Sequence, residues 1–315
     1  MPAARGCGVN SKGVITTDRP ARRDVEQFMR DELLESLPAG YDRAALLGAE
    51  RATYVISQTV SYEYSKPVRD LRQRLVVLPR KQHADQHRVA HKLAVVTTGE
   101  HSLTTRTDRF GNTVVRASVP RVRERIEFTT RAVIIRSTTE PNAVPWRSTA
   151  PSSTPLTAAD DAIRDAAHSL GPVRDVFDTA DAMSDMIRSS FEYAHDVTSV
   201  RTTAAEAWAL RQGLCQDMAH VMIAMSSSLG ICARYVSGHL VGDGASHAWV
   251  EIFDPRRQEV VAIDPTHRRR TDLRYITTAT GRDYRDVAPT SGTYSGRGSN
   301  GTLRVNKIIR LAEVA

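Results

Sequence analysis

A cysteine, a histidine and an aspartate, each in a distinct local pattern, place the strongest constraint on how this chain can fold. Cys215 lies in the stretch 213–220, at the point where apolar residues begin to recur with helical spacing. His247 lies in the apolar run at 245–251, and Asp264 ends a short β-rich run. In this order the three residue types supply a thiol nucleophile, a base and a group that orients the base. If they converge, the chain performs acyl transfer through a thioester.

The position of Cys215 bears on its reactivity. A thiol reacts as a thiolate, and a free cysteine with a pKa of about 8.5 is mostly protonated at neutral pH. A helix N-terminus and a neighbouring imidazolium both lower a thiol pKa. Because Cys215 follows Gly213 at the predicted helix start, unpaired backbone N–H groups are expected near its sulfur, where they could bind an oxyanion. A lone cysteine is more often a small buried hydrophobe, but the histidine and aspartate patterns favour the nucleophile.

Strand register predicts how His247 and Asp264 meet. Residues 254–257 have proline at the second position of a turn. If the flanking strands pair symmetrically about this turn, Phe253 faces Gln258 and His247 faces Asp264. Directly opposed residues have Cβ atoms roughly 5 Å apart, which suits a carboxylate that accepts from an imidazole N–H. A slip of one residue would put the two side chains on opposite faces.

The chain divides into four predicted parts. Residues 1–51 form an N-terminal extension with a short helix, and residues 52–136 contain β-rich runs between turns, which predicts a β-sandwich. Residues 137–156 are a linker rich in Pro, Ser and Thr. In residues 157–315 helices precede an antiparallel sheet, which predicts an α+β fold. The expected helices are 157–170, 180–191 and 215–230, the expected strands are 233–237, 247–253, 259–264 and 303–311, and 278–301 is expected to be a surface loop.

Composition and charge argue against two classes of partner, nucleic acids and membranes. The net charge is +7, but the arginines are scattered and the densest run, 268–270, is three residues long. Nucleic-acid modules concentrate basic residues on one face, so no nucleic-acid partner is expected. No window approaches 18 apolar residues, and the first residues lack the apolar core of a signal peptide. The odd count of three cysteines favours a reducing compartment. We therefore expect a cytoplasmic protein without a membrane partner.

Metal sites are weakly supported. A zinc site built from Cys215, Cys232 and histidines lacks any closely spaced ligand pair, so Cys232 is expected to fill the core. His83, His87 and His91 recur every four residues, which would align them on a helix. However, they lie among predicted strands and no carboxylate sits at a matching position. We therefore predict no metal and no cofactor.

Several motifs together resemble those of the bacterial transglutaminase-like superfamily. The core motifs are found at 213–220, 233–238, 246–251 and 264–266, with a further segment at 281–287. Residues 64–67 and 108–112 are similar to motifs of the β-rich domain that precedes this core in the family. The resemblance covers roughly residues 52–311.

The resemblance implies a papain-like α+β core in which Cys215, His247 and Asp264 form a catalytic triad. Members act as transglutaminases, peptidases or amidases that share a thioester intermediate. The backbone N–H of Cys215 is the expected oxyanion donor, and Tyr193 is a weaker second candidate whose alternative role is packing. We favour a cysteine peptidase or amidase acting on a peptide or protein amide, because a promiscuous crosslinking enzyme would be hazardous in the cytoplasm. The alternatives are a protein-glutamine transglutaminase and a non-catalytic binding module on the same fold.

Overall fold

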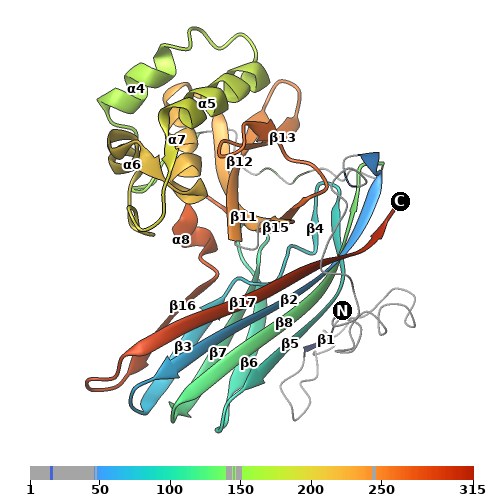
Figure 1. The fold of residues 1–315 in the computed structure, drawn as a ribbon, viewed down its shortest axis with the longest axis vertical. Helices are drawn as coiled ribbons and strands as arrows, with labels where there is room; N and C mark the ends of the chain where they lie inside the picture. Colours follow the sequence, from blue (N-terminus) through green and yellow to red (C-terminus); the bar gives the residue numbers. More distant parts are fainter. Residues whose placement is uncertain are drawn as a thin grey trace, which may run out of the picture. The chain divides into compact units, whose positions relative to one another are not determined.

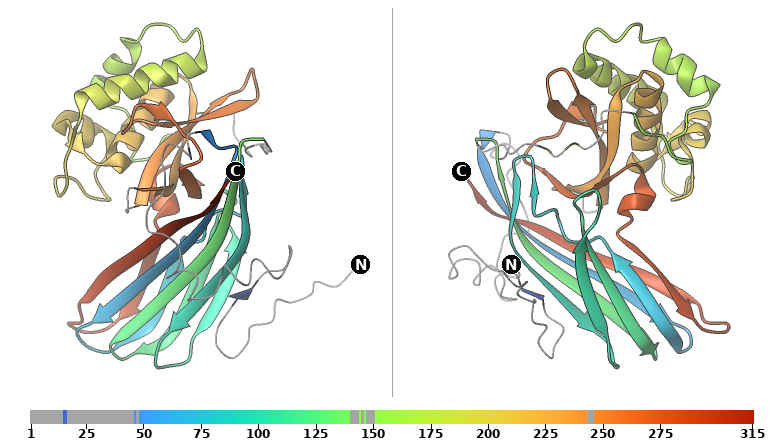
Figure 2. Two further views of the ribbon diagram at one scale, coloured as in Figure 1. Left: turned by 45° about the vertical axis from the view of Figure 1, so that its right-hand side comes forward. Right: turned by 180° about the vertical axis from the view of Figure 1, so that it is seen from behind.

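The computed structural model describes residues 15–16, 46, 48–139, 144, 146, 151–242 and 246–315. The chain forms two compact units, which are described separately. The first unit comprises Met1–Asn142 and Pro289–Ala315, and the second comprises Ala143–Ala288. Both are shown in Figures 1 and 2. The helix expected within residues 1–51, together with Cys7, lies outside the described residues.

The first unit contains two antiparallel sheets that enclose one apolar core, as expected for a β-sandwich. One sheet has the order β1-β5-β8-β2-β17, with β4 paired to β5. Its strands are β1 (Ile15–Thr16), β2 (Arg51–Tyr64), β4 (Gln82–His83), β5 (Gln86–Val96), β8 (Arg125–Ser137) and β17 (Gly301–Val314). The other has the order β16-β3-β7-β6, with β3 (Val68–Leu75), β6 (Ser102–Thr107), β7 (Thr113–Val122) and β16 (Thr290–Ser295).

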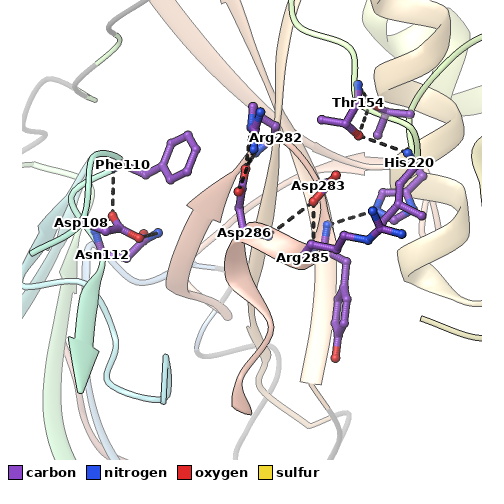
Figure 3. Close-up of polar contacts among 12 residues, drawn as sticks. Asp108, Phe110, Asn112, Thr154, His220, Arg282, Asp283, Arg285 and Asp286 are labelled. Carbon is purple, nitrogen blue, oxygen red and sulfur yellow. Dashed lines mark hydrogen bonds and ion pairs between the residues drawn. The ribbon is translucent and has the colours of Figure 1, made fainter. Parts of the chain in front are cut away.

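The turn predicted at 108–112 joins β6 to β7. Asp108 Oδ1 accepts the backbone N–H groups of Phe110 and Asn112, each over 2.9 Å (Figure 3). Aspartate favours such turns because its short side chain replaces a backbone acceptor. The core enclosed by the two sheets is built from alternating apolar residues, including Val60, Tyr64 and Phe128 of one sheet and Leu71, Leu75 and Val119 of the other.

The last 27 residues correct the predicted domain boundary. We expected residues 157–315 to form one unit, with 303–311 as a strand of its sheet and 278–301 as a loop. Instead β17 pairs with β2 from Gly301↔Tyr64 to Val314↔Ala52, and β16 pairs with β3. Both strands therefore belong to the first unit. Alternating apolar residues identify a strand, but they carry no information on a partner more than 200 positions away.

The second unit has helices before an antiparallel sheet, and this confirms the predicted α+β class. Helix α7 packs against β11 and β12, while α5 packs against β12 and β13 (Figure 2). The helices are α4 (Asp161–His168), α5 (Val176–Ser190), α6 (Ala204–Leu210), α7 (Cys215–Ser228) and α8 (Tyr284–Val287). The sheet order is β14-β13-β12-β11-β15, with β11 (Cys232–Leu240), β12 (Ser246–Asp254), β13 (Glu259–Asp264), β14 (Arg269–Arg270) and β15 (Tyr275–Gly281).

The local sequence explains where most of these helices begin. Asp160 caps α4 by accepting the N–H of Ile163, and Asp175 caps α5. Helix α6 was not predicted, although Thr203 and Glu206 form a capping box at its start. Within the described ranges, no helix is both long enough and apolar enough to cross a bilayer.

Candidate active site

Cys215 is the first residue of α7, as predicted, and is 9% exposed. The preceding Leu214 occupies the N-cap position but has no side-chain oxygen, so it caps no N–H group. Asp217 N donates to Leu214 O, but the N–H groups of Cys215 and Gln216 make no hydrogen bond to the described residues. Two N–H groups that have no partner in the described part of the chain therefore lie at Cys215 and the next residue, at the positive end of the helix dipole.

His247 is buried near the start of β12 and faces Gly238 of the neighbouring strand β11. Its ring stacks on that of Trp249, with centroids 6.3 Å apart. A Cβ at Gly238 would collide with the Trp249 ring and with the carbonyl oxygen of Ile276. Glycine at this position therefore lets β11, β12 and β15 approach closely enough to bury the imidazole.

The register between β12 and β13 differs from the predicted one by two positions. Val250 pairs with Ile263 and Asp254 pairs with Glu259, so the loop consists of residues 255–258. In this register His247 does not lie directly opposite Asp264, which corrects the prediction. Because side chains alternate with a period of two, the two residues still share a face. They meet on the diagonal, with 2.7 Å between His247 Nε2 and Asp264 Oδ2.

Asp264 is fully buried and collects several donors. Its Oδ2 atom accepts from His247 Nε2, from His267 Nδ1 and from the Tyr275 hydroxyl, each over 2.7 Å. Its Oδ1 atom accepts the N–H of Thr266 over 2.9 Å. A carboxylate with four donors is held in one rotamer and in its charged form.

These hydrogen bonds determine the charges of Asp264 and His247. Burial raises the pKa of Asp264, but the hydrogen bonds from His247, His267 and Tyr275 outweigh it and hold that pKa well below its usual range. Burial lowers the pKa of His247, but hydrogen bonds to Asp264 and Cys215, together with their negative charges, raise it to about 10. His247 is therefore an imidazolium at neutral pH, facing a carboxylate.

The same imidazole links the carboxylate to the thiol. Since Nε2 of His247 is bonded to Asp264, Nδ1 is the ring nitrogen left for the hydrogen bond with the Cys215 side chain. The structure thus brings together Cys215, His247 and Asp264 in the order predicted. Chemically, such an arrangement can move a proton between a sulfur and an acceptor while the carboxylate fixes the ring orientation.

Tyr193, the second candidate for an oxyanion donor, lies on a strand next to the chain that enters α7. Tyr193 belongs to β9 (Glu192–Tyr193), which pairs in parallel with β10 (Gln212–Gly213) just before Cys215. Its ring is 42% exposed and contacts that of His195 edge-on. A donor role for Tyr193 therefore stays a prediction. Cys232 is buried at the start of β11, where burial raises the pKa of its thiol.

The three regularly spaced histidines do not share a helical face. His83 lies on β4, and His87 and His91 lie on β5. His83 and His91 are buried, whereas His87 is exposed. Burial, together with the charge of Arg88, lowers the pKa of His91 to about 4.

Among the described residues, the ligand atoms of His247, Asp264 and His267 lie within 4.8 Å of one another. The hydrogen bonds from the two rings to one oxygen of Asp264 account for this clustering. The sequence had given no reason to select His267 or Tyr275. For His267 the available signal is its position three residues after the aspartate, where a tight turn can return the ring to the carboxylate.

A second buried histidine, His220, lies on α7 and links this helix to α8. Its Nε2 atom accepts the backbone N–H of Tyr284 over 3.1 Å, which joins α7 to α8 (Figure 3). Asp283 caps α8 beside this contact by accepting the N–H groups of Arg285 and Asp286. Burial is the main reason that the pKa of His220 falls to about 4, so the ring is neutral.

The sequence matches known families over both units. Residues 164–265 match the transglutaminase-like superfamily, and residues 54–135 match the bacterial transglutaminase-like N-terminal region. The chain therefore belongs to the transglutaminase-like superfamily, as the motifs indicated.

Individual relatives extend this assignment. The uncharacterized protein Rv2569c of Mycobacterium tuberculosis is 29% identical over 287 residues, which cover 80% of this chain and 91% of that protein. The uncharacterized protein ML0607 of Mycobacterium leprae is 38% identical over 135 residues, 40% of this chain and 47% of its own. A crystal structure from Cytophaga hutchinsonii, provisionally described as a cysteine protease, aligns with a TM-score of 0.66 and 21% identity. It covers 84% of this chain and 91% of its own, and at this identity it shows a shared fold.

Proposed function

We propose that this chain is a cysteine peptidase or amidase that cleaves an amide bond of a peptide or protein through a thioester on Cys215. One observation carries the proposal: a buried imidazole is hydrogen-bonded to the thiol of Cys215 and to the carboxylate of Asp264. The unsatisfied N–H groups at the start of α7 support it, because they suit a developing oxyanion.

In the proposed reaction the Cys215 thiolate attacks the carbonyl carbon of the amide, and the carbonyl oxygen becomes an oxyanion. The N–H groups of Cys215 and Gln216 stabilise that oxyanion. His247 then donates its proton to the leaving amine as the C–N bond breaks and the thioester forms. Water, deprotonated by His247, attacks the thioester, and the C–S bond breaks to release the carboxylic acid and the Cys215 thiolate, which again faces the protonated His247. Asp264 fixes the ring orientation of His247 throughout.

Hydrolysis is preferred over transfer to an amine on physical grounds. Water needs no binding site of its own, whereas a transglutaminase must hold an amine and exclude water from the thioester. We also propose a reducing compartment such as the cytoplasm, because the nucleophile has to remain a free thiol.

Acyl-enzyme trapping tests the proposal. The protein is mixed with the 4-nitrophenyl ester of an N-acetylated peptide and its intact mass is followed, with and without a primary amine. We expect one acyl group on Cys215, released as the free acid, and no adduct in the Cys215→Ala variant. Cys232→Ala is the matched control and should acylate normally.

Two other outcomes select the alternatives. Release of the acyl group mainly as an amide at millimolar amine would identify a transglutaminase. Absence of any adduct on Cys215 would contradict the enzyme proposal and favour a binding module.

A further inference from the structure

The segment that leads into the cysteine, residues 194–203, is fastened to the first turn of α7 at two points. The Thr198 hydroxyl donates to Asp217 Oδ2 over 2.7 Å. Gln216 Nε2 donates to the carbonyl oxygen of Ser199 over 3.3 Å. Residues 198 and 199 therefore lie against the two helix residues that immediately follow Cys215.

Asp217 couples this segment to the start of the helix. The same Oδ2 atom that accepts from Thr198 also accepts the N–H of Leu214 over 2.8 Å. The carboxylate is buried, and a Cβ at Gly213 would lie 2.7 Å from Oδ2, so only glycine leaves room for it. A single side chain thus fixes the chain entering α7 and the neighbouring segment in one arrangement.

The first residues of the segment are anchored as well. Tyr193 pairs with Gly213, and Ala194 N donates to Gly213 O over 3.2 Å. Next to the anchors at Thr198 and Ser199 the segment exposes two valines, Val197 at 41% and Val200 at 51%. Single exposed apolar residues are common on protein surfaces. These two differ because each adjoins a residue that is bonded to the first turn of α7.

We propose that residues 194–203 form the wall that contacts the acyl part of the substrate, and that Val197 and Val200 select an apolar side chain there. This inference rests on the proposed function, because it assigns the substrate class of the same site. Thr198 and Asp217 act as positioning residues, because their hydrogen bond fastens the segment that carries both valines to the first turn of α7. An acyl group with a charged side chain would lose solvation against these valines without gaining a partner.

Reactive probes that differ only in side chain test the selection. Acetyl-divalyl, acetyl-diaspartyl and acetyl-dilysyl fluoromethyl ketones are compared by their second-order rate of modification of Cys215, with iodoacetamide as a probe that lacks side chains. We expect the divalyl probe to react at least about tenfold faster than either charged probe, the range that a small apolar contact supplies.

Substitutions in the wall should remove this preference. Val197→Asp and Val200→Asp should each lower the ratio of the divalyl rate to the iodoacetamide rate by about tenfold, because any change in the reactivity of the thiol itself affects both rates and cancels in the ratio. The matched control is Val173→Asp, since Val173 is also partly exposed, at 36%, but adjoins the far end of α7 near Leu229. The control should change neither rate.

The hydrogen bond from Thr198 to Asp217, which tethers the segment to α7, is tested separately. Thr198→Val removes the hydroxyl but keeps the size of the side chain, and should weaken binding of the divalyl probe without changing the iodoacetamide rate. Thr198→Ser should restore binding. Equal loss of both rates in Thr198→Val would show that Thr198 acts on the nucleophile and would overturn its assigned role.

The results separate this inference from the function on which it rests. If iodoacetamide modifies Cys215 below pH 7 but the divalyl probe is not preferred, the inference is overturned and the proposed function stands. The same holds if the preference survives both valine substitutions. If Cys215 shows no reactivity below pH 7, the proposed function fails and the inference falls with it.

Discussion

One buried histidine of the second unit belongs to α7, and another lies on β12 against the first residue of that helix. His220 and His247 are both almost inaccessible to solvent. Burial alone would make each ring neutral, and it does so for His220, whose pKa falls to about 4. For His247 the pKa instead rises to about 10.

The difference comes from the hydrogen-bond partners. His220 Nε2 accepts a backbone N–H, which favours the neutral ring. His247 Nε2 donates to the buried carboxylate of Asp264 and also bonds the Cys215 side chain, which favours the charged ring. The two imidazole rings are similarly buried but have different roles. His220 holds two helices together, while His247 is arranged to exchange a proton.

The largest effect should come from removing the charge that distinguishes the two environments. Asp264→Asn keeps the shape but removes the negative charge, so the pKa of His247 should fall and the imidazolium should be lost at lower pH. We expect acylation to slow by about 10²- to 10⁴-fold. The alkaline limb of its pH profile should move down by roughly one to three pH units.

Stopped-flow acylation across pH measures both quantities. The control is Asp181→Asn, because Asp181 is a half-buried residue of the same unit whose carboxylate pairs with Arg270. An unchanged alkaline limb in Asp264→Asn would contradict the role given to the carboxylate.

A change at His220 should affect stability and leave the chemistry intact. His220→Leu removes the acceptor for Tyr284 N–H, and an unsatisfied buried group costs about 1–3 kcal/mol. Urea unfolding followed by tryptophan fluorescence reports on the second unit, since all three tryptophans, at 146, 208 and 249, lie in it. The pH profile of Cys215 alkylation should keep its shape. A shift in that profile would mean that His220 also tunes the thiol.

Mild acid should destabilise the second unit through His220. Its pKa is about 4 in the folded state and about 6.5 in an unfolded chain, so the unfolded state binds more protons between these values. The stabilisation is complete above pH 6.5 and is lost as pH falls towards 4, by up to about 3 kcal/mol. The contribution of His247 to stability changes with pH in the opposite direction. It is present below pH 6.5 and is lost as pH rises through about 10. Urea midpoints measured at pH 5 and 7.5 should differ less in His220→Gln than in the native protein.

The smallest effect is expected at a histidine that has neither kind of environment. His87 is exposed on β5, so His87→Ala should change stability by less than about 0.5 kcal/mol. Activity should be equally insensitive to this substitution. Loss of activity in His87→Ala would require a role for the regularly spaced histidines that their separation on β4 and β5 does not support.

The sequence was most informative where the signal is local. The start of α7 at Cys215 and the bounds of β13 followed from helical spacing and a short β-rich run. The register between β12 and β13 was wrong by two positions, because the loop spans residues 255–258 and Gln258 adopts a left-handed conformation with φ of 57°. The shared face of His247 and Asp264 was still predicted, since an even shift preserves it.

The sequence was least informative where contacts depend on distant chain segments. The Tyr275 hydroxyl reaches Asp264 from β15, a strand that does not pair with β13. The tether from Thr198 to Asp217 joins a loop to a helix. Neither contact leaves a periodic pattern in the sequence, and the pairing of β17 with β2 was missed for the same reason.

The central claim is that His247 and Cys215 form a charged pair held by Asp264. It is tested most directly by the rate of Cys215 alkylation with iodoacetamide from pH 4 to 11, resolved by peptide mapping so that Cys7 and Cys232 are read separately. We expect the rate to show a transition near pH 10, where His247 loses its proton and the charged pair is broken. A single transition at about pH 8.5, the same as for an unpaired thiol, would contradict the account.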